Sequence, residues 1–312
     1  MPQRIRIFVA LLAFVVCSIA SADEDPFLLI LGTAQDAGFP QAGCKKACCA
    51  DAWKHRARQR YTASLAIIDP VSKQRWIIDA TPNFREQLQM VDEVCPSEQQ
   101  RSPVDGILLT HGHIGHYTGL MHLGREVIGA KAVPVFAMPR MEKFLQTNGP
   151  WSQLVKLNNI RLTPIREEKV VTLNARISVT PFLVPHRDEF TETVGFKIQG
   201  PKRSAIYLPD IDKWERWQTK IEDLVADVDI AFVDGSFFDN EELPGRDMSL
   251  IPHPFVVESI DRFKDLPRAD RSKVRFIHLN HTNQLLHSDS AAQKIVKQAG
   301  HYVAKQGERH SI

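Results

Sequence analysis

The sequence predicts an α+β protein in which two β-sheets pack face to face with helices outside, an αββα sandwich. Two successive parts of the chain each run through short apolar strands and then into helical patterns. The sequence shows no internal repeat, low-complexity tract or linker that would divide it. Elements with one apolar face must bury it against another element, and this layered arrangement does so for sheets and helices alike.

The strands of the first part are apolar runs bounded by turn residues. We expect strands at residues 27–32, 64–69, 75–80, 105–109 and 133–138, and helices at 81–91, 119–126 and 140–147. The second part predicts strands at residues 160–164, 170–173, 177–182, 193–198, 204–208, 228–233 and, as the last strand, 273–279. Its helices are expected at 254–263 and 291–298, and loops at 126–132, 150–159 and 240–246 are expected to determine specificity.

The N-terminus predicts a cleavable secretory signal. Two arginines precede an apolar run over residues 7–20, and residues 20–22 form a small-x-small cleavage site. As a helix this run would span only about 21 Å, short of a hydrocarbon core of roughly 30 Å. We therefore expect a signal peptide at residues 1–22, one domain at 23–312, and a periplasmic or secreted protein without membrane contact after cleavage.

The charge balance argues against a polyanion partner. Without Arg4 and Arg6 the chain has as many basic as acidic residues, 37 of each. Nucleic-acid binding depends on clustered positive charge, and no long Lys/Arg cluster occurs. We expect a small-molecule substrate and no nucleic acid; a homodimer is compatible with the sequence.

Three histidines directly follow the strand predicted at residues 105–109. His111 and His113 are two apart, so in an extended turn both rings leave one face of the backbone. His116 comes three residues later, where a helix beginning in the loop would turn its ring toward them. Neutral imidazole is the commonest protein ligand for metals such as zinc. The spacing favours a metal site over a loop of solvated rings.

Other strand ends carry side chains of ligand type. They are Asp79, His186, Asp210, and the pair His278 and His281. One such residue is usually a turn or cap residue. Together with the strand before His111, however, five strand ends show the same preference, which favours one site where the loops leave the strands. The remaining histidines in polar or helical surroundings are expected at the surface: His55, His122, His287, His301 and His310.

Four cysteines lie beyond the predicted signal: Cys44, Cys48, Cys49 and Cys95. In an oxidising compartment an even number predicts two disulfides. The alternative is a structural zinc held by thiolates and a distant histidine. The spacing alone leaves both open.

These motifs resemble the metallo-β-lactamase superfamily, whose signature His-x-His-x-Asp-His follows a buried strand. Residues 31–41 with the cysteine group, and residues 80–88, 232–236 and 278–283, are similar to one branch, the pyrroloquinoline quinone biosynthesis proteins B (PqqB). The similarity runs over nearly the whole chain after residue 22. It implies the αββα fold and a metal site at the edge of the sandwich.

The resemblance also implies a role for each candidate residue. His111, His113 and His186 resemble the ligands of a first metal, and His116 and His278 those of a second. Asp210 resembles the carboxylate that bridges the two metals; in a hydrolase we expect it to hold or deprotonate the attacking water. Asp79 resembles an acid that orients ligand histidines, and His253 lies where relatives often place a leaving-group acid.

Two departures from the relatives affect what the resemblance implies. Gly115 stands where the signature has Asp, which leaves His116, His278 and Asp210 for the second metal, a set that also suits Fe²⁺. PqqB differs in the opposite way, because it keeps that Asp and loses the first histidines. We therefore expect a PqqB-like protein without assigning it to quinone-cofactor synthesis.

The resemblance also implies a role for the cysteines. Related phosphodiesterases bind a structural zinc through a Cys-rich motif and a histidine three residues after the last catalytic ligand. Cys44, Cys48, Cys49 and His281 match this set, although the Cys-x3-Cys-Cys spacing differs from theirs. The resemblance favours structural zinc over disulfides.

The leading prediction is an exported hydrolase with one or two Zn²⁺ ions that cleaves a phosphodiester or another ester. One alternative is an iron-dependent oxygenase in quinone-cofactor biosynthesis. The other is a non-catalytic protein that binds a metal or cofactor.

Overall fold

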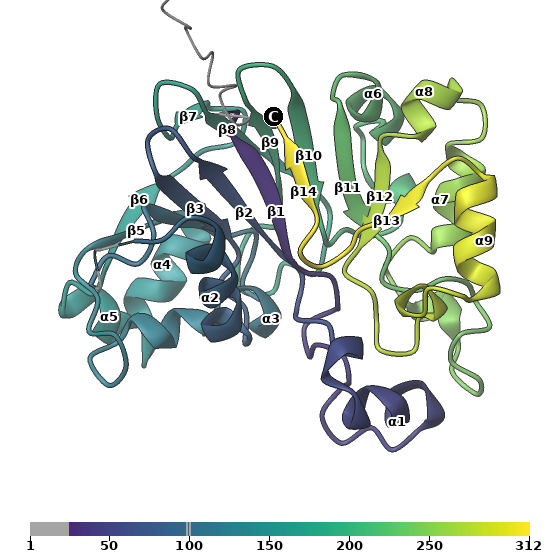
Figure 1. Cartoon of the computed structure of the whole chain (residues 1–312), viewed down its shortest axis with the longest axis horizontal. Helices are drawn as coiled ribbons and strands as arrows, with labels where there is room; N and C mark the ends of the chain where they lie inside the picture. Colours follow the sequence, from purple (N-terminus) through teal and green to yellow (C-terminus); the bar gives the residue numbers. More distant parts are fainter. Residues whose placement is uncertain (1–24, 98, 100) are drawn as a thin grey trace, which may run out of the picture.

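Two β-sheets lie face to face at the centre of the molecule, and helices cover their outer sides (Figure 1). This computed structural model describes residues 25–97, 99 and 101–312, so the predicted signal peptide at 1–22 lies outside the described residues. The predicted αββα fold class is confirmed. None of the described helices is both long and apolar enough to cross a membrane.

The first sheet has seven strands among the described residues, in the order β14-β1-β2-β3-β4-β5-β6. They are β1 (Phe27–Gly32), β2 (Ser64–Asp69), β3 (Gln74–Ile78), β4 (Gly106–Leu108), β5 (Val133–Ala137), β6 (Ile160–Pro164) and β14 (Arg309–Ser311). Pairing is antiparallel from β14 to β3 and parallel from β3 to β6.

The second sheet repeats this plan, with seven described strands in the order β13-β12-β11-β10-β9-β8-β7. They are β7 (Val171–Thr172), β8 (Ser178–Leu183), β9 (Val194–Gln199), β10 (Ser204–Leu208), β11 (Ile230–Asp234), β12 (Val274–Ile277) and β13 (Tyr302–Val303). Pairing is antiparallel from β7 to β10 and parallel from β10 to β13.

The core follows from the alternation of side chains along each strand. In β1, Leu28 and Ile30 belong to the cluster between the sheets, whereas Leu29 and Leu31 belong to the cluster under the helices. Successive strand residues point to opposite faces, and here both faces are covered, which explains the continuous apolar run. A one-residue slip would exchange the two sets of contacts, so the layers hold the register.

The helices form the two outer layers. Beside the first sheet lie α2 (Phe84–Val94), α3 (Ile114–Tyr117), α4 (Pro139–Thr147) and α5 (Trp151–Lys156). Beside the second lie α6 (Ile221–Ala226), α7 (Val256–Arg262), α8 (Arg268–Arg271) and α9 (Ala291–Gln298), while α1 (Ala47–Lys54) projects below the sheets in Figure 1. Short 3₁₀ turns are η1 (Arg56–Arg58), η2 (Thr118–Leu123), η3 (Trp214–Arg216), η4 (Met248–Leu250) and η5 (Gln284–Leu286).

Several predicted elements need correction. The helix expected at 119–126 is instead α3 followed by the 3₁₀ turn η2, and helix α5 occupies the loop expected at 150–159. Trp151 packs edge-on against Tyr117, with ring centroids 5.0 Å apart; this long-range contact leaves no periodic signal in so short a helix.

The chain end and one histidine also differ from expectation. The strand expected at 273–279 is not the last, because β13 and β14 follow it; β14 is a short, mostly polar strand at the sheet edge that lacks an apolar run. His301 was expected at the surface but is buried, and its Nδ1 atom lies 2.8 Å from the carbonyl oxygen of Arg271. The backbone carbonyl partners one ring nitrogen of His301, while Nε2 is buried without a hydrogen-bond partner among the described residues.

Candidate metal centre

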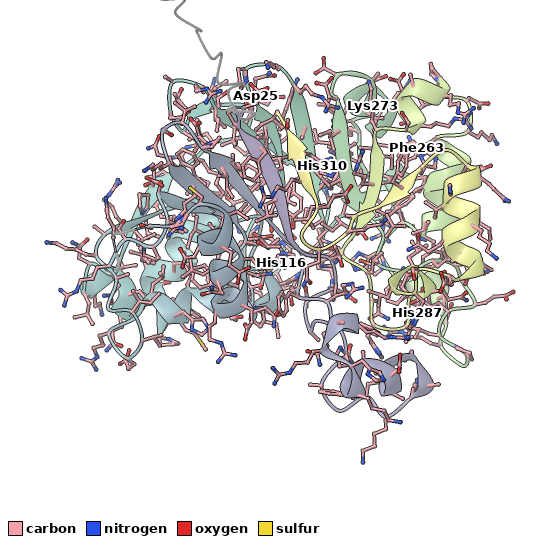
Figure 2. All side chains as sticks on the ribbon, in the orientation of Figure 1. Asp25, His116, Phe263, Lys273, His287 and His310 are labelled. Carbon is pink, nitrogen blue, oxygen red and sulfur yellow. The ribbon has the colours of Figure 1, made fainter. Side chains whose placement is uncertain are left out.

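The site residues lie at one edge of the sandwich, where the parallel strands have their carboxyl ends. β3, β4, β10, β11 and β12 end at or just before the residues Asp79, His111, Asp210, Asp234 and His278, respectively. Ligand sites of α/β sheets form outside the carboxyl ends of parallel strands, and both sheets contribute here. In Figure 2, His116 lies at the lower end of the strands, away from Asp25 at their upper end.

The first cluster comprises His111, His113, His186 and Asp210, whose candidate ligand atoms all lie within 4.8 Å of one another. Nε2 of His111 is 2.9 Å from Nδ1 of His113. The Asp210 carboxylate faces both sides, with Oδ2 3.4 Å from Nε2 of His111 and Oδ1 3.3 Å from Nε2 of His186. The three predicted histidines therefore meet around one point.

The second cluster shares Asp210 with the first and adds His116, His278 and Asp36. Oδ2 of Asp210 lies 3.8 Å from Nε2 of His116 and 3.9 Å from Nε2 of His278. Oδ1 of Asp36 is closer, at 3.1 Å and 3.4 Å from the same two nitrogens. Asp36 is absent from the predicted site residues. It lies within the loop after β1, and the one available signal was its place in the PqqB-like stretch at residues 31–41.

Three of the clustered histidines are held in place through the Nδ1 atom of the ring, which contacts a carboxylate or a hydroxyl. Nδ1 of His116 is 2.8 Å from Oδ2 of Asp79, and Nδ1 of His278 is 2.9 Å from Oγ of Ser236. Nδ1 of His186 is 3.2 Å from Oδ1 of Asp212. Such partners set the ring orientation and leave Nε2 as the free ligand atom. Sequence reasoning proposed Asp79 for this arrangement but missed Asp212 and Ser236.

Two strand ends have unusual backbone conformations. Asp79 and His278 have φ angles of 67° and 66°, in the left-handed region that side chains other than glycine seldom adopt. Such conformations cost on the order of 1–3 kcal/mol each and concentrate at functional sites. Here the turn aims the two side chains into the space between the sheets' ends.

His253 lies between two carboxylates. Its Nδ1 atom is 2.8 Å from Oδ2 of Asp234 and 3.2 Å from Oδ1 of Asp210. Burial lowers the pKa of this imidazole, but Asp234 and Asp210 outweigh burial and raise the pKa to about 9. The ring is 5.5 Å from that of His186, so His253 borders the first cluster.

Unpaired polar atoms at the centre of the site test whether a cation fits. Among the described residues, Nε2 of His186, Oδ1 of Asp210 and Nε2 of His278 are buried without a hydrogen-bond partner. An unpaired buried polar group costs about 1–3 kcal/mol, so three together are unfavourable unless a ligand satisfies them. Imidazole nitrogens and carboxylate oxygens are zinc donors. Burial and the neighbouring His116 also hold the pKa of His111 well below its usual range, and the neutral ring is the metal-binding form. The donor set fits a divalent cation.

A third cluster joins α1 to the loop after β12. Sγ of Cys44 is 3.9 Å from Sγ of Cys48, and Nδ1 of His281 is 3.8 Å from Sγ of Cys48 and 3.4 Å from Sγ of Cys49. The cysteines of the described chain are all free, so neither predicted disulfide is present. Zinc–sulfur bonds of about 2.3 Å place tetrahedral ligands roughly 3.8 Å apart. Cys95 packs in the cluster under α2, on the other side of the first sheet.

The family comparison identifies the domain to which this edge belongs. Residues 74–279 match the model of the β-lactamase superfamily domain. Asp36 and the three clustered cysteines precede the matched region.

Curated relatives and solved structures agree with this match. The chain is 26% identical to coenzyme PQQ synthesis protein B of Ruegeria pomeroyi over 305 residues, covering 90% of this chain and 98% of that protein. Identity to the same protein of Methylorubrum extorquens strain PA1 is also 26%, over 309 residues, with the same coverage. The predicted resemblance to the PqqB branch is thereby confirmed.

Similar solved structures share the fold. Zn²⁺-bound PqqB from Methylobacterium extorquens superimposes with a TM-score of 0.78 at 23% identity, covering 92% of this chain and all of that one. A diphosphatase of the PhnP family gives 0.61 at 21% identity, covering 92% and 97%. Human tRNase Z, short form, gives 0.55 at 12% identity, covering 92% and 99%.

Proposed function

Because this chain belongs to the metallo-β-lactamase superfamily, we propose that it is a metal-dependent hydrolase that cleaves an ester bond at the shared edge of its two sheets. One observation carries the proposal. Three buried atoms that lack a hydrogen-bond partner among the described residues, Nε2 of His186, Oδ1 of Asp210 and Nε2 of His278, belong to two donor clusters that share Asp210. We propose Zn²⁺ as the resident ion, one or two per chain at this edge.

The roles of the residues follow from their positions. A divalent cation in the first cluster would lower the pKa of a bound water from 15.7 toward roughly 7, and so supply hydroxide at neutral pH. His111, His113 and His186 would hold that cation. Asp210, between the clusters, accepts a hydrogen bond from the attacking water and orients it.

His253 is the proposed proton donor to the leaving group. Its Nδ1 atom is occupied by Asp234 and Asp210, which leaves Nε2 for the substrate. The carboxylate of Asp234 holds the ring in place because it also accepts a hydrogen bond from the amide of Ile211. General acids of this kind contribute typically 10²–10⁴-fold to a rate.

An anionic ester, with phosphodiesters first, is the proposed substrate class. Arg187 follows His186 directly, is exposed, and has no hydrogen-bond or ion-pair partner in the described part of the chain. Its positive charge opposes protonation of both neighbouring histidines: it adds to the burial that lowers the pKa of His113, and it only partly offsets Asp234 and Asp210, which raise the pKa of His253 to about 9. A free guanidinium beside the site suits a phosphate group, which it can bind through two parallel hydrogen bonds.

The test compares His113→Ala with His287→Ala on panels of phosphodiesters, lactones and thioesters. His287 is an exposed histidine outside the three clusters, so its variant controls for loss of an imidazole. Losing an outer-shell partner costs 10–100-fold, so losing a ligand should reduce turnover by about 100-fold or more. Undiminished hydrolysis by His113→Ala would contradict the proposal. Tight zinc binding without turnover on any panel would instead indicate an accessory metal-binding protein.

The second candidate is an iron-dependent oxygenase. The second cluster combines two histidines with carboxylates, which also suits Fe²⁺, and the chain is similar to coenzyme PQQ synthesis proteins B. Purification without oxygen, followed by metal analysis, separates the candidates. Zinc with oxygen-independent turnover supports the hydrolase, whereas iron with oxygen-dependent turnover supports the oxygenase.

We also propose that the protein is exported, on the basis of the signal predicted at residues 1–22. N-terminal sequencing of protein from the periplasm or culture medium should begin at Asp23. Light scattering after size exclusion tests the homodimer, and a gel-shift assay tests the expected lack of nucleic-acid binding.

A further inference from the structure

Position 115 lacks room for a side chain because Asp36 fills the space. A Cβ atom built on Gly115 would lie 2.6 Å from Cα and 2.7 Å from Cβ of Asp36, and closer still to its Oδ1. Gly115 has no left-handed φ, so close approach, and no special conformation, requires glycine here. Asp36 therefore occupies the place of the aspartate that the resemblance predicts at position 115.

The Asp36 carboxylate faces the same nitrogens that the second cluster offers. Oδ1 lies 3.1 Å from Nε2 of His116 and 3.4 Å from Nε2 of His278. Nδ1 of His116 is taken by Asp79 and Nδ1 of His278 by Ser236, so both Nε2 atoms are free to turn toward Asp36. The Nε2 atom of His278 has no hydrogen bond among the described residues although Asp36 is near, as expected for donors that converge on a shared ligand.

The loop that carries Asp36 is anchored to both sheets. The backbone amide of Gln35 donates a hydrogen bond of 2.9 Å to the backbone carbonyl of Leu279, a residue just after β12 of the second sheet. The hydroxyl of Thr62 donates to the carbonyl of Asp36 at 3.2 Å, just before β2 of the first sheet. A ligand held on both sides needs little reordering when it binds a cation.

We propose that Asp36 is a ligand of a second cation, together with His116, His278 and Asp210, and that Gly115 exists to admit it. The inference rests on the proposed function, because it requires the histidine edge to bind metal. Two carboxylates and two imidazoles make this site richer in oxygen than the first, which has three imidazoles. Oxygen ligands shift preference toward harder cations such as Mn²⁺ and Fe²⁺, so the two positions should differ in selectivity.

The experiment counts metal in wild type, Asp36→Asn and the control Gln35→Ala. Each protein is stripped with a chelator and reloaded with Zn²⁺; bound ions are counted by mass spectrometry, and affinity is measured by chelator competition. Asparagine preserves shape and removes the charge, so folding should persist, as circular dichroism can verify. We expect Asp36→Asn to bind one ion fewer per chain, with that ion held roughly 100-fold more weakly or worse. Gln35→Ala, in the same loop, should match wild type.

A double-mutant cycle tests the role of Gly115. Gly115→Ala should displace Asp36 and release the same ion, but should cost little more in the Asp36→Asn background, because the ligand is already lost. The cysteine site is counted separately by the charge-transfer absorption of cobalt thiolates after Co²⁺ loading.

The possible results separate this inference from the proposed function. Retention of the second ion by Asp36→Asn at wild-type affinity would overturn the role of Asp36. A wild-type protein with a single ion at the histidine edge would also overturn it, yet would leave a one-metal hydrolase intact. A wild-type protein with no ion there would refute the proposed function itself, and this inference with it.

Discussion

Oδ2 of Asp79 lies 2.8 Å from Nδ1 of His116, while Oδ1 accepts a hydrogen bond from the amide of Thr110 at 2.8 Å. The Thr110 hydroxyl is in turn 3.0 Å from Nδ1 of His111. One buried carboxylate at the end of β3 thus supports a histidine of each cluster, His116 directly and His111 through a hydroxyl.

Asp79→Asn should weaken metal binding at both clusters, and more at the second. The amide keeps the shape, but it cannot accept from both Thr110 and His116, so His116 loses its orientation. We expect a 10–100-fold loss of affinity for the second ion, measured by chelator competition. Asp69→Asn is the matched control, since Asp69 is equally buried but lies at the far end of β2 beside Arg176. Equal affinities for wild type and Asp79→Asn would show that the carboxylate does not orient the ligand.

Asp212→Asn should act mainly on the first cluster. Oδ1 of Asp212 is 3.2 Å from Nδ1 of His186, and Oδ2 accepts from Nη1 of Arg216 at 2.8 Å. Removing the charge frees the His186 ring, so the first ion should be held roughly tenfold more weakly or worse, with the second ion less affected. Arg216 is largely exposed, so Arg216→Ala should have a smaller effect. The same titration checks both variants, and loss confined to the second ion would contradict the assignment.

The layers of the fold were predictable because buried strands leave a contiguous signal. β1, β2, β6 and β10 occupy the predicted residues. β1, β2 and β10 are buried along almost their whole length, whereas β6 alternates apolar and polar side chains. The short helix α5 was not predicted; its first residue, Trp151, packs against Tyr117, which lies well before it along the chain. The hydrophobic periodicity within so short a segment does not reveal contacts with residues elsewhere in the chain.

The residues of the site also divide into those that the sequence predicts and those that only the fold brings together. His111, His113 and His116 are close in sequence, and their spacing already points to a shared ligand. Asp36 meets Gly115 and His116 only in the folded chain, because about eighty residues separate it from them. Asp212 is similar, because only the folded backbone places it behind His186.

Cys48→Ser should remove one zinc ion per chain and lower the thermal stability. Sγ of Cys48 lies within 3.9 Å of both Cys44 and His281, in the cluster that ties α1 to the loop after β12. Because structural zinc contributes directly to folding, we expect Tm to fall by at least about 5 °C. Cys95→Ser is the control: it changes a buried cysteine outside the cluster, so it should cost stability without changing the zinc count. An unchanged count for Cys48→Ser would exclude a thiolate zinc site.

Glu242→Gln should remove a pH dependence of the free energy of unfolding. Glu242 is half-buried; its carboxylate accepts from the amide of Phe238 at 2.6 Å and from the hydroxyl of Thr282. Burial outweighs these hydrogen bonds and raises the pKa from 4.5 to about 7. The folded protein therefore favours the protonated acid, whose stabilising contribution is complete below pH 4.5 and is lost as the pH rises through 7.

Glutamine mimics the neutral acid at every pH, so only wild type should show this loss. Between pH 5 and pH 8 the stability of wild type relative to Glu242→Gln should fall by about 2 kcal/mol. Urea unfolding of both proteins at the two pH values measures the difference. Glu241→Gln, an exposed neighbour, should run parallel to wild type. If the stability of Glu242→Gln instead changes with pH as that of wild type does, Glu242 titrates like an ordinary surface glutamate. The contact of residues 238–242 with the loop that carries His281 would then not shield the carboxyl group from water.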